Sequence, residues 1–329
     1  EYLKFRFGPK TQKTGAFFFF ISRVLGAAFR LFLVALVLYQ YIFKAWDIPF
    51  EMSVIISVLL IWVYTRKGGI NTIIWTDTIQ TTLMILSVIL SISYILSELD
   101  LTLLTFIESD NFKGMDQIFV TDDFNKKNYF IKSIIGGAFI TICMTGLDQD
   151  MMQKNLTCRN LGDAQKNIFW FCVILVIANL LFLFLGALLY LYSESVNFQL
   201  PTSTDDLYPL LALNELGFLT SIIFILGIIA AAYSSADSAL TSLTTSFCID
   251  FLDIQKRNNK RKTRLLVHIG FSILLFIVIL IFNEINDESV INSIFKAAGY
   301  TYGPLLGLFS FGIFTKYKIK DKFVFFVCL

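Results

Sequence analysis

The sequence predicts an all-α fold, a polytopic membrane protein whose helices form a bundle of about eight transmembrane segments. Of its 329 residues, 56% are hydrophobic and only 16% are charged, whereas soluble domains are about 45–50% apolar and about 25% charged. Phe alone occurs 35 times. A water-soluble fold of this size has too little polar surface to cover so many apolar side chains, so the excess must face lipid.

Eight apolar stretches are the candidate spans. A helix needs about 20 predominantly apolar residues, with some tolerance, to cross the hydrocarbon core of a bilayer. The stretches are 16–43, 50–65, 70–97, 129–148, 166–192, 214–249, 265–282 and 289–315. The sixth and the eighth are long enough to be strongly tilted or broken.

The loops between these spans alternate in charge, and this alternation predicts the orientation. If the first segment is cytoplasmic, then so are the loops 1–15, 65–69, 149–165, 250–264 and 316–322. With their flanks they hold 19 of the 27 Lys and Arg residues, and the opposite loops hold four. Because Lys and Arg concentrate in cytoplasmic loops, the split supports the span count and a multi-pass protein of the plasma (inner) membrane.

Composition also excludes several classes of function. The formal net charge is +2, and no basic domain or basic–aromatic stripe indicates binding to nucleic acid. The five cysteines have no paired spacing, and His268 is the single histidine, so a zinc centre with several histidines is excluded. No nucleophile–histidine pair supports an enzyme, and we expect neither catalysis nor a bound cofactor.

Ionisable residues inside the predicted spans are the functional candidates, because a charge at the bilayer centre costs about 2.5–3.5 kcal/mol on insertion scales. The acidic candidates are Asp77, Asp148, Asp150 and Asp237, and the basic ones are Arg23, Arg30 and Lys296.

The sixth span carries the strongest polar pattern. Hydroxyl residues recur at helical spacing from Ser234 to Thr245, around the carboxylate of Asp237, so they lie on roughly one helix face. Oxygen ligands suit hard cations, and a weakly held Na⁺ needs such a row of hydroxyls together with free backbone carbonyls. The alternative is that these small residues allow helices to pack closely.

Two earlier segments are polar as well. Asp77 lies about two turns into the third span, where it either serves a site or is a structural acid paired with Arg23 or Arg30. At the end of the fourth span, Gly146 is followed by the polar run 148–154. This pattern predicts a broken helix that lines a cavity, where irregular backbone is tolerated at membrane depth. The alternative is that the helix simply ends at the cytoplasmic face.

The eighth span contains Pro304, which lacks an N–H and clashes with the preceding turn, so a kink is expected. Just before it, Tyr300, Thr301 and Tyr302 are candidates to face a permeation path. A kink without a function is the alternative.

Together the four segments resemble the sodium/solute symporter family, whose members include sodium-coupled carriers of sugars, proline, sialic acid and iodide. The order and spacing of the motifs fit along nearly the whole chain. The resemblance is carried by Gly68-Gly69 with Trp75-Thr76-Asp77 and Gln80, by Gly146 with Asp148-Gln149 and Gln153, by Ser234-Ser235-Ala236-Asp237-Ser238, and by Gly303-Pro304 with Gly307.

The resemblance implies the leucine-transporter-type fold, an inverted repeat of five plus five helices. The predicted spans are then core helices three to ten, and the first two core helices are missing. Residues 1–329 are expected to be a single transmembrane transporter domain truncated at both ends. In it, 1–148 holds the rest of the first repeat and the start of the second, and 149–329 holds the remainder of the second.

The resemblance also implies site residues. The common sodium site falls at Ala231, Ser234 and Ser235, and a possible second Na⁺ site falls at Asp77, Asp237 and Ser238. Asp148, Gln149 and Gln153 correspond to the broken sixth helix that lines the substrate cavity in the family, and we add Tyr300 to this cavity.

We therefore expect a secondary active transporter that brings a small organic solute into the cell with Na⁺ by alternating access. Its expected partners are the solute, Na⁺ as the coupling ion and the lipid bilayer. The alternatives are a proton-coupled or sodium-independent permease of the same fold and a membrane sensor or receptor for a solute. The sequence identifies neither the solute nor an oligomeric state.

Overall fold

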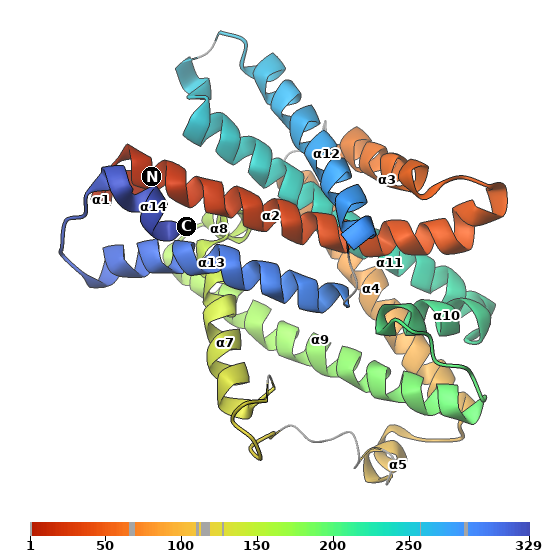
Figure 1. Ribbon diagram of the computed structural model, residues 1–329. Coiled ribbons are helices and arrows are strands. Elements are labelled where there is room, and N and C mark those ends of the chain that lie inside the picture. Colours follow the sequence, from red (N-terminus) through yellow and green to blue (C-terminus); the bar gives the residue numbers. More distant parts are fainter. Residues whose placement is uncertain are drawn as a thin grey trace. The chain divides into compact units, whose positions relative to one another are not determined.

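Helices are the only regular elements in the part of the chain that the computed structural model describes, namely residues 2–65, 70–109, 112, 119–126, 128–256, 258–285 and 289–329 (Figure 1). The all-α prediction is confirmed. The long helices are α2 (Pro9–Leu38), α3 (Phe50–Thr65), α4 (Ile70–Glu98), α7 (Phe130–Ile142), α9 (Leu161–Ser195), α11 (Gly217–Ser246), α12 (Lys260–Ile285) and α13 (Val290–Phe314).

Short helices connect or extend these. They are α1 (Tyr2–Arg6), α5 (Leu103–Glu108), α8 (Gln149–Leu156), α10 (Leu207–Asn214) and α14 (Val324–Cys328), and the 3₁₀ turns η2 (Lys44–Trp46), η4 (Thr204–Asp206), η6 (Ile254–Lys256) and η7 (Asp321–Phe323). Single π-helical turns continue α2, α7 and α11, as η1 (Tyr39–Phe43), η3 (Cys143–Leu147) and η5 (Phe247–Phe251).

Every predicted span contains one long helix. In the described residues, six helical stretches are long and apolar enough to cross a membrane, and they coincide with spans one, three, four, five, six and seven. The second span, α3, contains a shorter apolar helix, Phe50–Trp62. The eighth, α13, has 25 residues but is not among the six, because the polar, glycine-containing stretch 299–304 lowers its mean hydropathy.

The chain divides into two compact units. Unit 1 consists of residues 1–73, 139–154 and 232–329, and unit 2 consists of residues 74–138 and 155–231. The boundaries fall inside α4, α7, α8 and α11, so these four helices contribute to both units. These units do not test the predicted division into repeats between residues 148 and 149, which stays a prediction.

Unit 1 is built around α2, which packs against α13, α12 and α3 (Figure 1). Small and apolar residues of α2 allow this close packing: Ala28 and Ala35 are completely buried, and Leu31 is nearly so. Aromatic rings fill the space toward α12, where Phe29 and Phe282 stack with ring centroids 3.9 Å apart. Most of α2 is therefore screened from lipid, which places its polar residues in the interior of the unit.

Unit 2 contains α4, α9, α10 and the first part of α11. Gly227 of α11 allows the helix to approach α4, because an added Cβ would lie only 3.2 Å from Cβ of Ser87. The hydroxyl of Tyr208 on α10 lies between two α4 hydroxyls, 3.2 Å from Ser87 Oγ and 2.8 Å from Ser91 Oγ. Buried hydroxyls in an apolar setting must satisfy one another in this way.

Candidate functional site

The fourth predicted span is interrupted at Asp148. The π turn η3 ends there, and the Asp148 backbone is extended, with ψ at 126°. Its carbonyl accepts the N–H of Met152 at 3.1 Å, so Asp148 stands at the N-cap position of α8. Single π turns inside helices are frequent at functional sites. The helix break predicted from Gly146 and the polar run after it is confirmed, whereas its place in the wall of a cavity stays a prediction.

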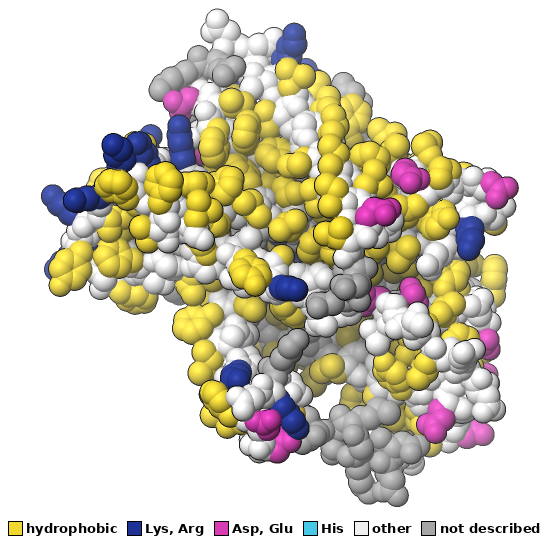
Figure 2. Space-filling model, in the orientation of Figure 1, with side chains coloured by type: hydrophobic (Ala, Val, Ile, Leu, Met, Phe, Trp, Pro, Cys, Tyr) yellow, Lys and Arg dark blue, Asp and Glu magenta, His cyan; other side chains and the backbone are white. Residues whose placement is uncertain are grey.

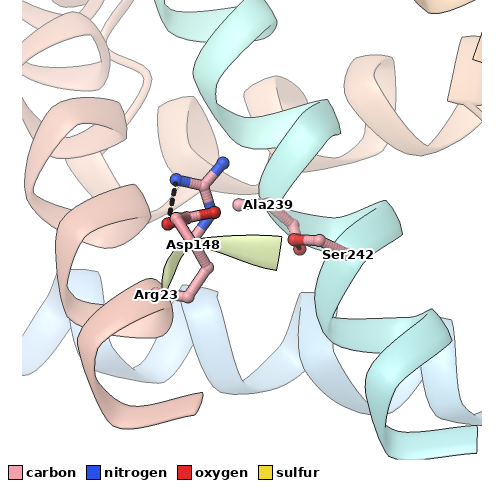
Figure 3. Close-up of polar contacts among 4 residues, drawn as sticks. All are labelled: Arg23, Asp148, Ala239 and Ser242. Carbon is pink, nitrogen blue, oxygen red and sulfur yellow. Dashed lines mark hydrogen bonds and ion pairs between the residues drawn. The ribbon is translucent and has the colours of Figure 1, made fainter. Parts of the chain in front are cut away.

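Asp148 forms a buried ion pair with Arg23 of α2. The Arg23 Nη1 and Asp148 Oδ2 atoms are 3.4 Å apart, and the two side chains are 13% and 3% exposed. Figure 3 shows the pair together with Ala239 and Ser242 of α11, and all four residues belong to unit 1. Because an isolated buried charge costs several kcal/mol, each of these groups stabilises the burial of the other.

Residues of α13 lie against the helix break. The Cys143 thiol of η3 donates to the carbonyl of Tyr302 at 4.0 Å, and the Tyr302 side chain hydrogen-bonds with Ser22 of α2. Thr301 is also buried, and its hydroxyl donates to the carbonyl of Ala297 at 2.8 Å. Tyr300, by contrast, is 76% exposed, since it lies on the face of α13 opposite Tyr302. Its assignment to the cavity stays a prediction.

The residues of the predicted common sodium site share one face of α11. Ala231, Ser234 and Ser235 are spaced three and four residues apart, and all three are half-buried. Asp237 is completely buried and Ser238 nearly so. A half-buried row of hydroxyls fits the oxygen ligands that a hard cation prefers.

The predicted second sodium site divides between the two units. Asp237 and Ser238 belong to unit 1, whereas Asp77 belongs to unit 2, where it is half-buried on α4. The predicted cavity residues Gln149 and Gln153 lie in α8, but their side chains are outside the described part of the structure. These site assignments remain predictions.

Sequence reasoning missed the pairing of Arg23 with Asp148. Both residues were recognisable as charges inside spans, but only Asp148 was assigned to a site. They are 125 positions apart in the chain, and local spacing carries no information about such a contact. A buried charge requires an opposite one, which predicts a basic partner for Asp148 but does not select Arg23 over Arg30 or Lys296.

Comparisons with known proteins extend these observations. The family model of the sodium:solute symporter family matches residues 1–320. The chain is 25% identical over 325 residues to the sodium/sialic acid symporter NanT of Aliivibrio fischeri, covering 96% of this chain and 63% of the relative. It is also 25% identical over 328 residues to sodium-coupled monocarboxylate transporter 1 of Mus musculus, covering 95% of this chain and 52% of the relative.

A solved structure gives the same result for the fold. The substrate-bound outward-open state of a Na⁺-coupled sialic acid symporter matches with a TM-score of 0.79 and 23% identity, covering 96% of this chain and 66% of that one. The chain therefore has the fold of that symporter, as the predicted leucine-transporter-type architecture requires, and it spans between half and two thirds of the length of these relatives. Each of them is a transporter by name and not an enzyme. With a family model matched across 1–320, the chain belongs to the sodium:solute symporter family.

Proposed function

We propose that the protein is a Na⁺-coupled symporter that takes up a small organic solute by alternating access. Na⁺ binding and solute binding are coupled when each ligand favours the same conformation. The observation that carries the proposal is the half-buried face of α11 on which the hydroxyls of Ser234 and Ser235 lie beside Ala231. Family membership and the names of the relatives support it.

Sodium binding is the first part to test. The measurement is saturable ²²Na⁺ binding to the purified full-length gene product, in the absence of solute, with Ser235→Ala and Asp77→Asn beside it. Thr244→Ala is the matched control, because it also removes one hydroxyl from α11. Thr244 lies on the opposite helix face, where its hydroxyl contacts His268 Nδ1 at 3.2 Å.

We expect both site variants to lose sodium binding and Thr244→Ala to keep it. If a folded, unsubstituted protein shows no saturable sodium binding, the sodium-coupled reading is wrong. The proton-coupled permease would then be the better interpretation, and uptake would follow the pH gradient.

The solute class that we propose is an organic anion. Arg23 is a guanidinium held in the interior of unit 1 beside a helix break, and such a group binds carboxylates with paired hydrogen bonds. The names of two relatives support the proposal, because sialic acid and monocarboxylates carry negative charge. An incoming carboxylate would compete with Asp148 for the same guanidinium.

The test compares sialic acid, lactate and uncharged glucose as stabilisers of the protein against thermal unfolding, with and without Na⁺. Changing Arg23 alone would remove the opposite charge of the ion pair from the buried Asp148, which costs about 3–5 kcal/mol. The double variant Arg23→Gln/Asp148→Asn keeps the volume and is neutral. We expect stabilisation by an acid in the unsubstituted protein and none in a folded double variant. Equal stabilisation of both proteins would refute the role of Arg23.

We also propose the orientation in which loops 1–15, 65–69, 149–165, 250–264 and 316–322 are cytoplasmic. The distribution of Lys and Arg supports it. Single cysteines introduced at Lys262 and at Lys126 in a cysteine-free background should differ in their reaction with an impermeant maleimide in intact cells. Labelling at Lys126 alone is expected, and the reverse result would invert the topology.

A further inference from the structure

An apolar groove runs between α3 and α12 on the outside of unit 1. Its volume is about 360 Å³, and the two helices pack side by side (Figure 1). The one hydroxyl in its wall, that of Ser272, already donates to the carbonyl of His268 at 2.9 Å. The other lining residues include Ile55, Leu59 and Trp62 of α3 and Ile269, Ile273 and Phe276 of α12. The groove therefore suits hydrocarbon and offers little to a polar solute.

The walls of the groove are open to the surroundings of the unit. Leu59 is 53% exposed and Ile273 is 54% exposed. Both lie on helices that coincide with predicted spans, so we expect lipid acyl chains at this surface. Exposing an apolar surface to lipid has no free-energy cost. A groove in that surface favours binding of an acyl chain that fills it, because the filled groove gains van der Waals contacts.

A cluster of basic residues lies at the N-terminal end of α12, beyond the groove. The α12 helix begins Lys260-Arg261-Lys262-Thr263-Arg264, with no acidic residue in its first turn. In Figure 2 the surface over α12 is largely apolar, and Lys and Arg side chains lie at the end where this helix begins. Cations at a helix N-terminus oppose the helix dipole, so the stability of α12 does not explain this cluster.

The charges and the groove are on the same face of α12. Ile269, Ile273 and Phe276 follow Lys262 by seven, eleven and fourteen residues, spacings that return to one helix face. At a rise of 1.5 Å per residue, the groove lies about 10–21 Å along the axis from Lys262. Half of a hydrocarbon core is about 15 Å thick. A lipid whose phosphate lies near Lys262 can therefore place an acyl chain in the groove within one leaflet.

We propose that this surface is a binding site for an anionic phospholipid of the leaflet in which α12 begins. An acyl chain lies between α3 and α12, and the phosphate and headgroup are held by Lys262 and Arg261. Basic segments next to membrane spans attract anionic lipids through the same electrostatics. Under the orientation proposed above, this leaflet is the cytoplasmic one.

The experiment measures lipid binding by native mass spectrometry of the full-length protein in a neutral detergent. Phosphatidylglycerol and phosphatidylcholine with identical acyl chains are titrated separately. The variants are Arg261→Gln/Lys262→Gln, which removes the charges, and Ile273→Trp, which fills the groove at a lipid-exposed position. The control is Lys316→Gln/Lys318→Gln, which removes two exposed lysines from another loop on the same predicted side of the membrane.

We expect phosphatidylglycerol to bind more tightly than phosphatidylcholine. The charge variant should lose about 30-fold in affinity for phosphatidylglycerol, as the electrostatic contribution of two basic residues predicts. Ile273→Trp should weaken both lipids, and the control should change neither. Equal binding of the two lipids, or an equal loss in the control pair, would overturn the proposal and leave a basic cluster that serves topology alone.

Discussion

The N-terminus of α2 is held by a carboxylate from the far end of the chain, and this contact predicts the effect of three substitutions. Asp321 Oδ1 accepts hydrogen bonds from the backbone N–H and the hydroxyl of Thr11, both at 2.7 Å. Its Oδ2 accepts the N–H of Lys10 at 3.1 Å. The carboxylate therefore satisfies donors that the first turn of a helix leaves without a partner.

Gly8 is the residue that lets this carboxylate approach. Its φ is +134°, and an added Cβ would lie 2.6 Å from Asp321 Oδ2. Gly8→Ala therefore combines a backbone conformation that costs about 1–3 kcal/mol with displacement of the capping group. Asp321→Ala removes the cap alone, at about 2 kcal/mol. Asp321→Asn keeps one acceptor oxygen and loses the charge, at about 1 kcal/mol.

The assay is unfolding of the purified protein in mixed micelles, with Gly8→Ala, Asp321→Ala and the double variant forming a cycle. Both single variants lose the Asp321 cap, so the sum of their destabilisations counts this loss twice. We therefore expect the double variant to be less destabilised than that sum by about 1–2 kcal/mol. Additive effects would show that the Gly8–Asp321 contact does not determine the stability of this end of α2, and the reasoning would be refuted.

The same carboxylate gives the contact a pH dependence. Burial raises the pKa of Asp321, but the hydrogen bonds from Thr11 and Lys10 outweigh it, and the net pKa is below the usual value. A lowered pKa contributes stability above the ordinary aspartate range near pH 4, and that stability is lost as pH falls through the folded value. The difference between the unsubstituted protein and Asp321→Asn should shrink below about pH 4. Asp122→Asn, at an exposed pair with Lys126, is the control and should have little effect at any pH.

The same unfolding assay checks three further destabilising substitutions and one control. Gly227→Ala should cost about 1–3 kcal/mol by overpacking against Ser87, whereas Gly26→Ala, with open space around the added Cβ, should be neutral or slightly stabilising. Tyr208→Phe removes the hydroxyl that joins two serines of α4 and should cost about 1–2 kcal/mol. Arg6→Gln removes the guanidinium that donates to carbonyls at the C-terminal end of α13 and should cost about 1–2 kcal/mol. An unchanged midpoint in any of the three destabilising cases would contradict the contact behind it.

The positions of the membrane helices could be predicted because apolar length and loop charge are strong local signals. The second predicted span, 50–65, coincides with α3. The helices α2, α9 and α12 begin before their apolar stretches, since hydropathy registers the lipid-facing core and not the polar turns beyond it. The α9 helix begins at Leu161, five residues before its predicted span, where the side chain of Asn160 accepts the N–H of Asp163 at 2.8 Å. Asn is a preferred N-cap residue, so Asn160 is a sequence signal for the start of this helix.

The candidate site could be predicted only where its signal is local. The break at Asp148 follows from a glycine and a polar run inside an apolar stretch, and the shared face of Ser234 and Ser235 follows from helical spacing. The partner of Asp148 could not be predicted, because several charges in the spans were possible partners. The choice of Arg23 depends on the packing of α2 in the interior of unit 1.

This packing also predicts which residue of the Arg23–Asp148 pair moves when the pair is broken. The Arg23 helix is tied to the rest of unit 1 along its length: Asp321 caps its first turn, and Phe282 stacks against Phe29 two turns beyond Arg23. Asp148 instead sits where a helix is interrupted and its backbone is extended, and hinges are formed by such terminal positions of helices. If a solute anion displaces the carboxylate from the guanidinium, we therefore expect Asp148 and the start of α8 to move while Arg23 stays in place. Distances from a spin label on α2 to one on α8, measured with and without the solute, should change, whereas distances between labels on α2 and α13 should not.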